Sequence, residues 1–171
     1  MANLTTQEKK FIAAARWNEI ESLQQLIIDK VNINIQSEKK DTALHWAVYQ
    51  EHVESTKILI DVGANLDIQD NKGYTALISS IYDAGRTNIT ELLINAGANL
   101  DIRNNEGKTA LDIAREEGLT EKIVLLEATA AKRTTQDRIK RNAGAMTSAI
   151  TALQDRPRRS APALKRRQHK R

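Results

Sequence analysis

The sequence predicts an all-α solenoid of stacked helix–turn–helix layers over residues 1–127, followed by a basic tail that is largely disordered or marginally helical. Three landmarks recur in one order at a period of 33 or 34 residues. They are Thr-Ala-Leu beginning at Thr42, Thr75 and Thr109, Gly-Ala-Asn-Leu-Asp-Ile beginning at Gly63 and Gly97, and a turn motif ending at Gly73 and Gly107. Such repetition indicates one structural unit stacked on copies of itself.

Each landmark has a local structural interpretation. The threonine opens a first helix, where its hydroxyl satisfies an orphan backbone N–H. Gly63 and Gly97 stand where a second helix ends in a left-handed conformation that glycine accepts cheaply. Gly73 and Gly107 close turns in the extended segment that leads to the next threonine. Three apolar triplets are predicted to lie in the second helices, wedged between layers: Ile58-Leu59-Ile60, Leu92-Leu93-Ile94 and Val124-Leu125-Leu126.

At these residues the chain resembles the ankyrin repeat. Thr42-Ala43-Leu44-His45-Trp46-Ala47 is similar to the family pattern Thr-Pro-Leu-His-x-Ala, with Ala43 in place of proline, and residues 89–99 are similar to its second-helix pattern along their whole length. The resemblance covers about three-quarters of the chain. It implies helix–turn–helix layers that stack side by side, with β-hairpin-like loops projecting from one edge.

Four repeats are predicted, at about residues 5–36, 37–69, 70–103 and 104–127. The first is degenerate: it lacks the turn and the glycine, with Lys30 where Gly63 falls in the next repeat. Thr5 and Glu8 predict a capping box at its first helix. The fourth ends without a Gly-Ala-Asn motif. Atypical end repeats are expected because their outer faces meet water.

The resemblance implies a non-enzymatic protein–protein interaction module, an adaptor whose partners are held by loop tips and by the exposed side of the first helices. The predicted partner-binding residues are Tyr49, Gln50, Gln69, Asn71, Lys72, Tyr74, Tyr82, Asp83, Arg103, Asn105, Glu106 and Lys108. A wider set adds Arg16, Trp17, Glu38, Lys39, Asp41, Glu116 and Glu117. The tyrosines are favoured because aromatic side chains bury much area while fixing few torsions.

Three further residues carry expectations of their own. Trp46 is assigned to the core rather than to the contact surface, and His45 is expected to hydrogen-bond backbone and loop groups between repeats, as in the family. The third repeat has one extra residue near Tyr82, because Thr75 to Gly85 spans one position more than Thr109 to Gly118. Two interpretations stay open there: neutral drift in a tolerant turn, or a lengthened first helix that re-aims Tyr82 toward a partner.

The composition argues against several other classes of protein. The absence of cysteine removes disulfides, thiolate nucleophiles and cysteine-based zinc sites. The three histidines, at 45, 52 and 169, have no metal-ligand spacing, and His52 is assigned to a loop. No glycine-rich phosphate loop occurs, so we expect no enzyme, cofactor or metal. The N-terminus lacks a signal-peptide pattern, which predicts a cytoplasmic location; the alternatives are secretion into a host cell or a nuclear location. The protein is also expected to be a monomer without a membrane span.

Charge divides the chain in two. Residues 1–126 carry 13 Lys+Arg and 19 Asp+Glu, a net charge of −6, whereas residues 127–171 carry 13 and 3, a net charge of +10. In the second part, Ile139, Ala143, Met146, Ile150 and Leu153 are spaced by 4, 3, 4 and 3. This apolar stripe predicts an amphipathic helix over residues 128–155, with disorder as the alternative.

Residues 156–171 are predicted to be disordered, since they combine nine basic residues, counting His169, with two prolines and no apolar period. Several functions compete for this tail. It could bind nucleic acid or an anionic membrane. It resembles both a nuclear import signal and the arginine-rich C-terminal signals of bacterial type IV secretion substrates, which would make the protein a secreted effector. It could also be solubilising or autoinhibitory. Ser160 resembles a basophilic kinase site.

Overall fold

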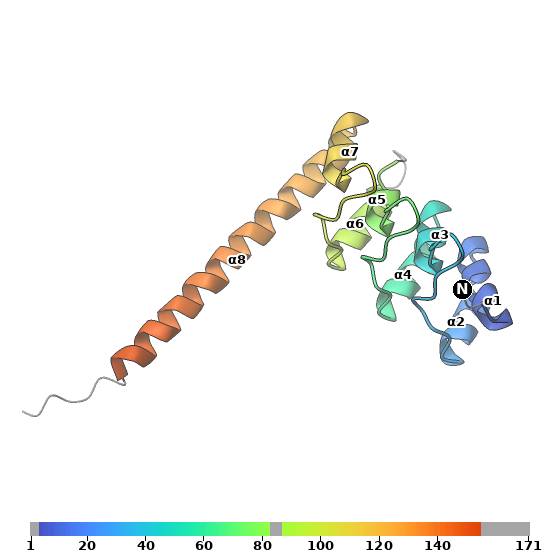
Figure 1. Ribbon diagram of the computed structural model, residues 1–171, viewed down its shortest axis with the longest axis horizontal. Helices are drawn as coiled ribbons and strands as arrows, with labels where there is room; N and C mark the ends of the chain where they lie inside the picture. Colours follow the sequence, from blue (N-terminus) through green and yellow to red (C-terminus); the bar gives the residue numbers. More distant parts are fainter. Residues whose placement is uncertain (1–3, 83–86, 155–171) are drawn as a thin grey trace, which may run out of the picture. The chain divides into compact units, whose positions relative to one another are not determined.

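The computed structural model describes residues 4–82 and 87–154, which form eight helices and no strand (Figure 1). The predicted all-α solenoid is confirmed, and its helices form four pairs along the described residues. The pairs are α1 (Thr6–Trp17) with α2 (Ile20–Ile28), α3 (Ala43–Tyr49) with α4 (Val53–Asp61), α5 (Ala76–Ser79) with α6 (Thr87–Asn95), and α7 (Ala110–Glu116) with α8 (Thr120–Gln154).

Like helices stack on like helices. In the first row α1 packs on α3, α3 on α5 and α5 on α7, while in the second row α2 packs on α4 and α4 on α6 (Figure 1). One hydrophobic cluster runs through all the layers, with Leu59, Leu93 and Leu126 almost fully buried in successive second helices. Val124 is 61% exposed, so its predicted place between layers is wrong. It lies two positions before Leu126 and therefore on the opposite side of α8.

The threonine caps are confirmed. Thr42, Thr75 and Thr109 each accept a hydrogen bond on Oγ1 from the backbone N–H three residues later, at the start of α3, α5 and α7. The capping box of α1 is also present, because Glu8 accepts the Thr5 N–H at 2.7 Å while Thr5 Oγ1 accepts the Glu8 N–H at 3.2 Å. Each cap satisfies donors that a helix start leaves unpaired.

Three hairpin loops precede the first helices of the second, third and fourth repeats. They occupy residues 37–41, 70–74 and 104–108, and each is closed by backbone hydrogen bonds between its ends. Neighbouring loops are joined to one another. The Asn71 N–H donates to the Lys39 carbonyl at 3.0 Å, and the Asn105 N–H donates to the Lys72 carbonyl at 3.1 Å. The loops therefore form a continuous row along one edge of the stack.

The first repeat turns in the same way as the others. Lys30 has φ of 60°, close to the 83° and 96° of Gly63 and Gly97 at the equivalent positions. The chain therefore turns after α2 without the glycine that the other repeats have there. The Lys30 side chain is exposed, so it meets no obstruction in the left-handed conformation, although this conformation costs lysine more free energy than it costs glycine.

The first helix of the third repeat is shorter than its counterparts, so the hypothesis of a lengthened helix is wrong. α5 has four residues, against seven in both α3 and α7. The Ser80 hydroxyl donates to the Leu77 carbonyl at 2.8 Å and lies 3.0 Å from Thr90 Oγ1. Such bonds compete with continuation of the helix. Asp83 lies outside the described residues.

Helix α8 continues far beyond the fourth repeat, through the segment for which the apolar stripe predicts a helix. The chain forms two compact units, residues 1–131 and 132–171. Within the second unit, Ile139 and Met146 are 56% and 68% exposed. Residues 156–171, with Ser160 and His169, lie outside the described residues. None of the described helices is long and apolar enough to cross a membrane.

Candidate partner-binding groove

A groove of about 520 Å³ lies between the second and third repeats. Four of the five Trp and Tyr side chains of the protein line it: Trp46, Tyr49, Tyr74 and Tyr82. Its other lining residues come from the loops and from the first helices of the two repeats: Lys39, Asp41, His45, Asp70, Asn71, Lys72 and Ser79. The groove therefore concentrates the aromatic side chains of a chain that is otherwise poor in them.

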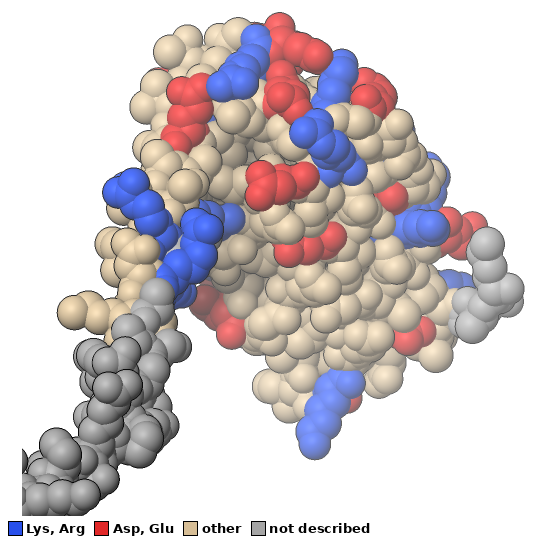
Figure 2. All heavy atoms as spheres, turned by 60° about the vertical axis from the view of Figure 1, so that its left-hand side comes forward, with Lys and Arg blue, Asp and Glu red and all other residues tan. Residues whose placement is uncertain are grey.

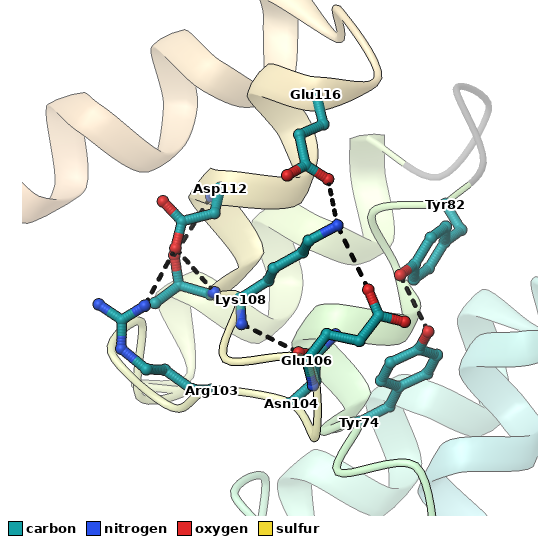
Figure 3. A network of polar contacts seen from close by, with 9 residues as sticks. Tyr74, Tyr82, Arg103, Asn104, Glu106, Lys108, Asp112 and Glu116 are labelled. Carbon is teal, nitrogen blue, oxygen red and sulfur yellow. Dashed lines mark hydrogen bonds and ion pairs between the residues drawn. The ribbon is translucent and has the colours of Figure 1, made fainter.

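The aromatic rings form two pairs. Trp46 and Tyr49, on α3, lie edge to face with their centroids 6.2 Å apart. Tyr74, from the loop, and Tyr82, after α5, lie 5.4 Å apart, and their hydroxyls are 3.0 Å from each other (Figure 3). Burial raises the pKa of Tyr82, and the hydrogen bond with Tyr74 raises it further. Tyr49 and Tyr82 are still 61% and 46% exposed, so both rings offer area to a partner.

Trp46 forms a wall of the groove, so its assignment to the core is wrong. The ring is half-buried and does not belong to the hydrophobic cluster that runs through the layers. The Arg16 guanidinium of the preceding layer lies over it, 4.2 Å from the ring centroid, and lies 5.0 Å from the ring centroid of Trp17. This cation–π stack holds the indole at the boundary between the interior and solvent.

His45 fixes the loop of the third repeat onto α3, as the sequence predicts. It is 5% exposed; its Nδ1 accepts the Thr42 N–H at 3.2 Å, and its Nε2–H donates to the Tyr74 carbonyl at 2.9 Å. These two bonds define the neutral tautomer. His52, assigned from sequence to a loop, has a similar inter-layer role, because its Nε2–H donates to the Arg16 carbonyl at 3.1 Å.

Asp41 is a half-buried carboxylate in the groove. Its hydrogen bond is a long one, 3.4 Å from the Ser37 hydroxyl, and no cation of the described residues forms an ion pair with it. Burial raises the pKa of Asp41; Asp70 also raises it, while His45, Ser37 and Lys39 lower it. The fold therefore holds a negative charge in a place that disfavours it.

Replacing Asp41 with asparagine is expected to raise the free energy of unfolding at neutral pH. The folded-state pKa of this carboxyl lies above 3.8, so the charged form costs stability at neutral pH, and the cost disappears as the pH falls through that pKa. Urea titrations at neutral and acidic pH should show a stabilised variant that converges with the wild type in acid. A destabilised Asp41→Asn at neutral pH would contradict this expectation; Glu106→Gln, at an exposed carboxylate, is the control.

Two cations at the loop before α7, Arg103 and Lys108, form ion pairs (Figure 3). Lys108 Nζ lies 2.6 Å from Glu116 and 3.3 Å from Glu106, and the hydrogen bonds to these two carboxylates raise the pKa of Lys108. Arg103 lies 3.4 Å from Asp112. The backbone N–H and the hydroxyl of the Thr109 cap lower the pKa of Asp112. These charges lie on the surface, so each pair adds little to stability.

Several predicted partner-binding residues are occupied in joining the loops. Gln69 Nε2 donates to the Gly73 carbonyl at 2.7 Å and to the Arg103 carbonyl at 2.8 Å. Asn105 Nδ2 donates to the Asn71 carbonyl at 3.0 Å, and Arg103 donates to the Gly107 carbonyl at 2.6 Å. The geometry gives these side chains a framework role.

The groove brings together five of the twelve predicted residues: Tyr49, Asn71, Lys72, Tyr74 and Tyr82. Six others lie outside its lining: Gln50, Gln69, Arg103, Asn105, Glu106 and Lys108. Sequence reasoning missed Asp70 and Ser79. A signal for Asp70 exists, since it matches Asn104 in the period. The side chains of Asp70 and Asn104 each accept hydrogen bonds from the backbone N–H groups two and four residues later, and so shape their loops.

Within the described residues, no group of three or more His, Cys, Asp or Glu side chains is placed to hold a metal ion. The model of the ankyrin-repeat family matches residues 11–104, over three copies of the repeat, and no curated protein matches the chain. The matched segment is more than half of the 171 residues, and the structure adds a fourth helix pair beyond it. Ankyrin repeats are generally protein–protein interaction modules and are typically non-catalytic. The chain belongs to the ankyrin-repeat family.

Proposed function

We propose that the protein is a non-enzymatic adaptor that holds its partner in the groove between the second and third repeats. The observation that carries this proposal is the gathering of Trp46, Tyr49, Tyr74 and Tyr82 on one groove. The buried core beneath them is aliphatic apart from Phe11, and of the four rings only Tyr74 packs against it. Tyrosine and tryptophan contribute most of the binding energy in many protein interfaces.

The rings are held in place before a partner arrives. Tyr82 is tied to Tyr74 through their hydroxyls, and Tyr74 lies in a loop that is fixed by His45. Trp46 is stacked between Arg16 on one side and Tyr49 at its edge. Fixed side chains lose less conformational entropy on binding, so the same contact area gives a higher affinity.

Replacing Tyr49 and Tyr82 together with alanine is expected to weaken partner binding by about tenfold or more, the effect of losing two interface aromatics. The partner is first isolated by affinity capture with the full chain, and its affinity is then measured by calorimetry. Both rings are largely exposed, so the fold should survive, which circular dichroism verifies. Ile28→Ala, at a 70% exposed apolar residue of α2, is the matched control. An unchanged affinity of the tyrosine variant would contradict the proposal.

A second candidate function, association with nucleic acid, is favoured by the net charge of +10 in residues 127–171. On the face of the molecule in Figure 2, basic and acidic side chains are intermingled rather than gathered into a basic patch. Nucleic acid would then bind through the basic tail. Because such binding rests on contacts between basic side chains and phosphates, it should fall steeply between low and physiological salt and should disappear when residues 156–171 are removed. Partner binding in the groove should survive that truncation.

A further inference from the structure

We propose that the partner presents an arginine side chain to the groove, where its guanidinium pairs with Asp41 and lies against the tyrosine rings. The inference rests on the protein-binding function proposed above and names the chemistry of the partner. It starts from Asp41, whose carboxylate lines the groove, is half-buried, and has no ion-pair partner among the described residues.

An unpaired carboxylate in such a place calls for a donor from outside. Its bond from Ser37 is 3.4 Å long, so most of its hydrogen-bonding capacity is unused. A guanidinium supplies two parallel N–H donors that match the two carboxylate oxygens, whereas an ammonium supplies only a point charge. The raised pKa of Asp41 agrees with a negative charge that lacks compensation in the free protein.

The walls of the groove suit the same group. A planar guanidinium stacks on aromatic faces and is less strongly hydrated than an ammonium. The protein already makes this contact within its own chain, where Arg16 lies 4.2 Å from the centroid of Trp46. That indole face is taken, but Tyr49 and Tyr82 are more than 40% exposed and line the groove. An arginine from the partner would meet the carboxylate and these rings in one cavity.

The other charged residues of the groove restrict the charge of the partner segment that can bind there. Lys39 and Lys72 lie at exposed loop tips beside it, and Lys72 Nζ is 6.0 Å from the Tyr74 ring. Together with Asp41 and Asp70 they make the charged lining neutral, with two cations and two carboxylates. A run of basic residues would gain no net attraction and would meet both lysines. The groove therefore fits one arginine flanked by an acidic residue.

The test uses the full chain and a capped pentapeptide that carries a central arginine and one glutamate. The matched peptide has citrulline, which keeps the shape of arginine but has no charge. Binding is followed by NMR at the Trp46 indole N–H. We expect the arginine peptide to bind about tenfold or more tightly than the citrulline peptide, and Asp41→Asn to remove that difference. Glu106→Gln, at an exposed carboxylate outside the groove, should leave it intact.

Equal affinities of the two peptides for the wild type would overturn the inference. So would an Asp41→Asn variant that keeps the preference for arginine. Neither result touches the proposed adaptor function, which stands or falls with the double tyrosine variant and the captured partner. The arginine inference is also overturned if a matched peptide with lysine in place of arginine binds as tightly, because the proposed contact depends on the planar, two-donor geometry of the guanidinium.

The pH dependence of the affinity for the arginine peptide is a further test, because a purely structural role of Asp41 would not change it. The titratable groups that face this carboxyl are His45, Asp70 and Lys39. Arginine binding should weaken as the pH falls through the pKa of Asp41, and this decrease should be absent in Asp41→Asn. A decrease that persists in the variant would overturn the role of Asp41.

The basic tail of the protein is a competing source of arginine, and one variant separates it from a partner. In this variant the six arginines at positions 156, 158, 159, 166, 167 and 171 are replaced by glutamine in the full chain. An unchanged affinity for the arginine peptide supports occupation by a partner. An increase of about tenfold would overturn that assignment, because the arginines of the tail would then compete for the groove.

Discussion

Replacing Gly73 with alanine is expected to destabilise the protein by about 2–4 kcal/mol, against about 1 kcal/mol for the same change at Gly107. The two glycines occupy equivalent positions in consecutive loops and have nearly equal φ angles of 77° and 78°. Both variants therefore carry the same cost of placing alanine in the left-handed region. They differ in what the new Cβ atom would touch.

The surroundings of the two glycines decide the difference. A Cβ atom at Gly73 would lie 2.7 Å from both the backbone nitrogen and Oδ1 of Asn105, and 3.0 Å from the carbonyl carbon of Asn104. A Cβ atom at Gly107 would have no heavy atom within 4 Å. Asn105 cannot yield freely, because its N–H donates to the Lys72 carbonyl at 3.1 Å. Relieving the clash therefore moves the loop of the third repeat, residues 70–74, away from the loop of the fourth, residues 104–108.

Urea unfolding of the two variants, monitored by circular dichroism, measures the difference directly. Lys40→Gly is the reverse substitution, because Lys40 has φ of 62° at the equivalent position of the second repeat. It should stabilise the protein by up to about 1 kcal/mol, since glycine accepts this conformation more easily. Equal decreases in the free energy of unfolding for Gly73→Ala and Gly107→Ala would show that the contact with Asn105 adds no cost at Gly73.

Features that depend on a few neighbouring residues could be predicted from the sequence. The caps at Thr42, Thr75 and Thr109 and the turns at the periodic glycines follow from local backbone chemistry, and the 33–34-residue period places them in layers. The left-handed turn at Lys30 was hidden, because a turn imposed by stacking need not show its preferred residue. Tertiary context decides the conformation there.

The groove was harder to predict than the fold. The family pattern places position 46 inside the protein, but the Trp46 ring is only half-buried and lines the groove. Gln69 and Asn105 have the polarity of contact residues, yet the row of loops uses their amides as internal links. Sequence alone does not separate these roles, since both need an exposed amide at a loop tip.

Lys122 was not identified at all, because a lysine in an amphipathic helix normally indicates the solvent face. The structure buries it to 1% exposure, and its Nζ donates to the Ser80 carbonyl at 2.7 Å and to the Ile81 carbonyl at 3.2 Å. Counted from the threonine caps, its position matches Ser55 in the second repeat, and both residues face the turn between the helices of the preceding layer. The stretch that follows the short helix α5 is thus held from the fourth repeat.

Replacing Lys122 with alanine is therefore expected to destabilise the protein by about 3–5 kcal/mol. The change empties the space of a buried side chain and leaves buried carbonyls without their donor. Lys57→Ala, at an exposed lysine of α4, should cost less than about 0.5 kcal/mol in the same urea titration. A loss at Lys122 no larger than that at Lys57 would show that water replaces the ammonium at no cost.

Lys122→Met separates the two parts of this effect and links them to the groove. Methionine keeps most of the apolar stem but has no donor, so its cost measures the hydrogen bonds alone, about 1–3 kcal/mol. Because Tyr82 directly follows the two anchored carbonyls, freeing them should loosen the ring that faces Tyr74. Hydrogen exchange at residues 80–82 should accelerate in a folded Lys122→Met protein, and partner affinity should fall although Lys122 does not line the groove. Unchanged exchange there would mean that the loop of Tyr74, rather than α8, sets the position of Tyr82.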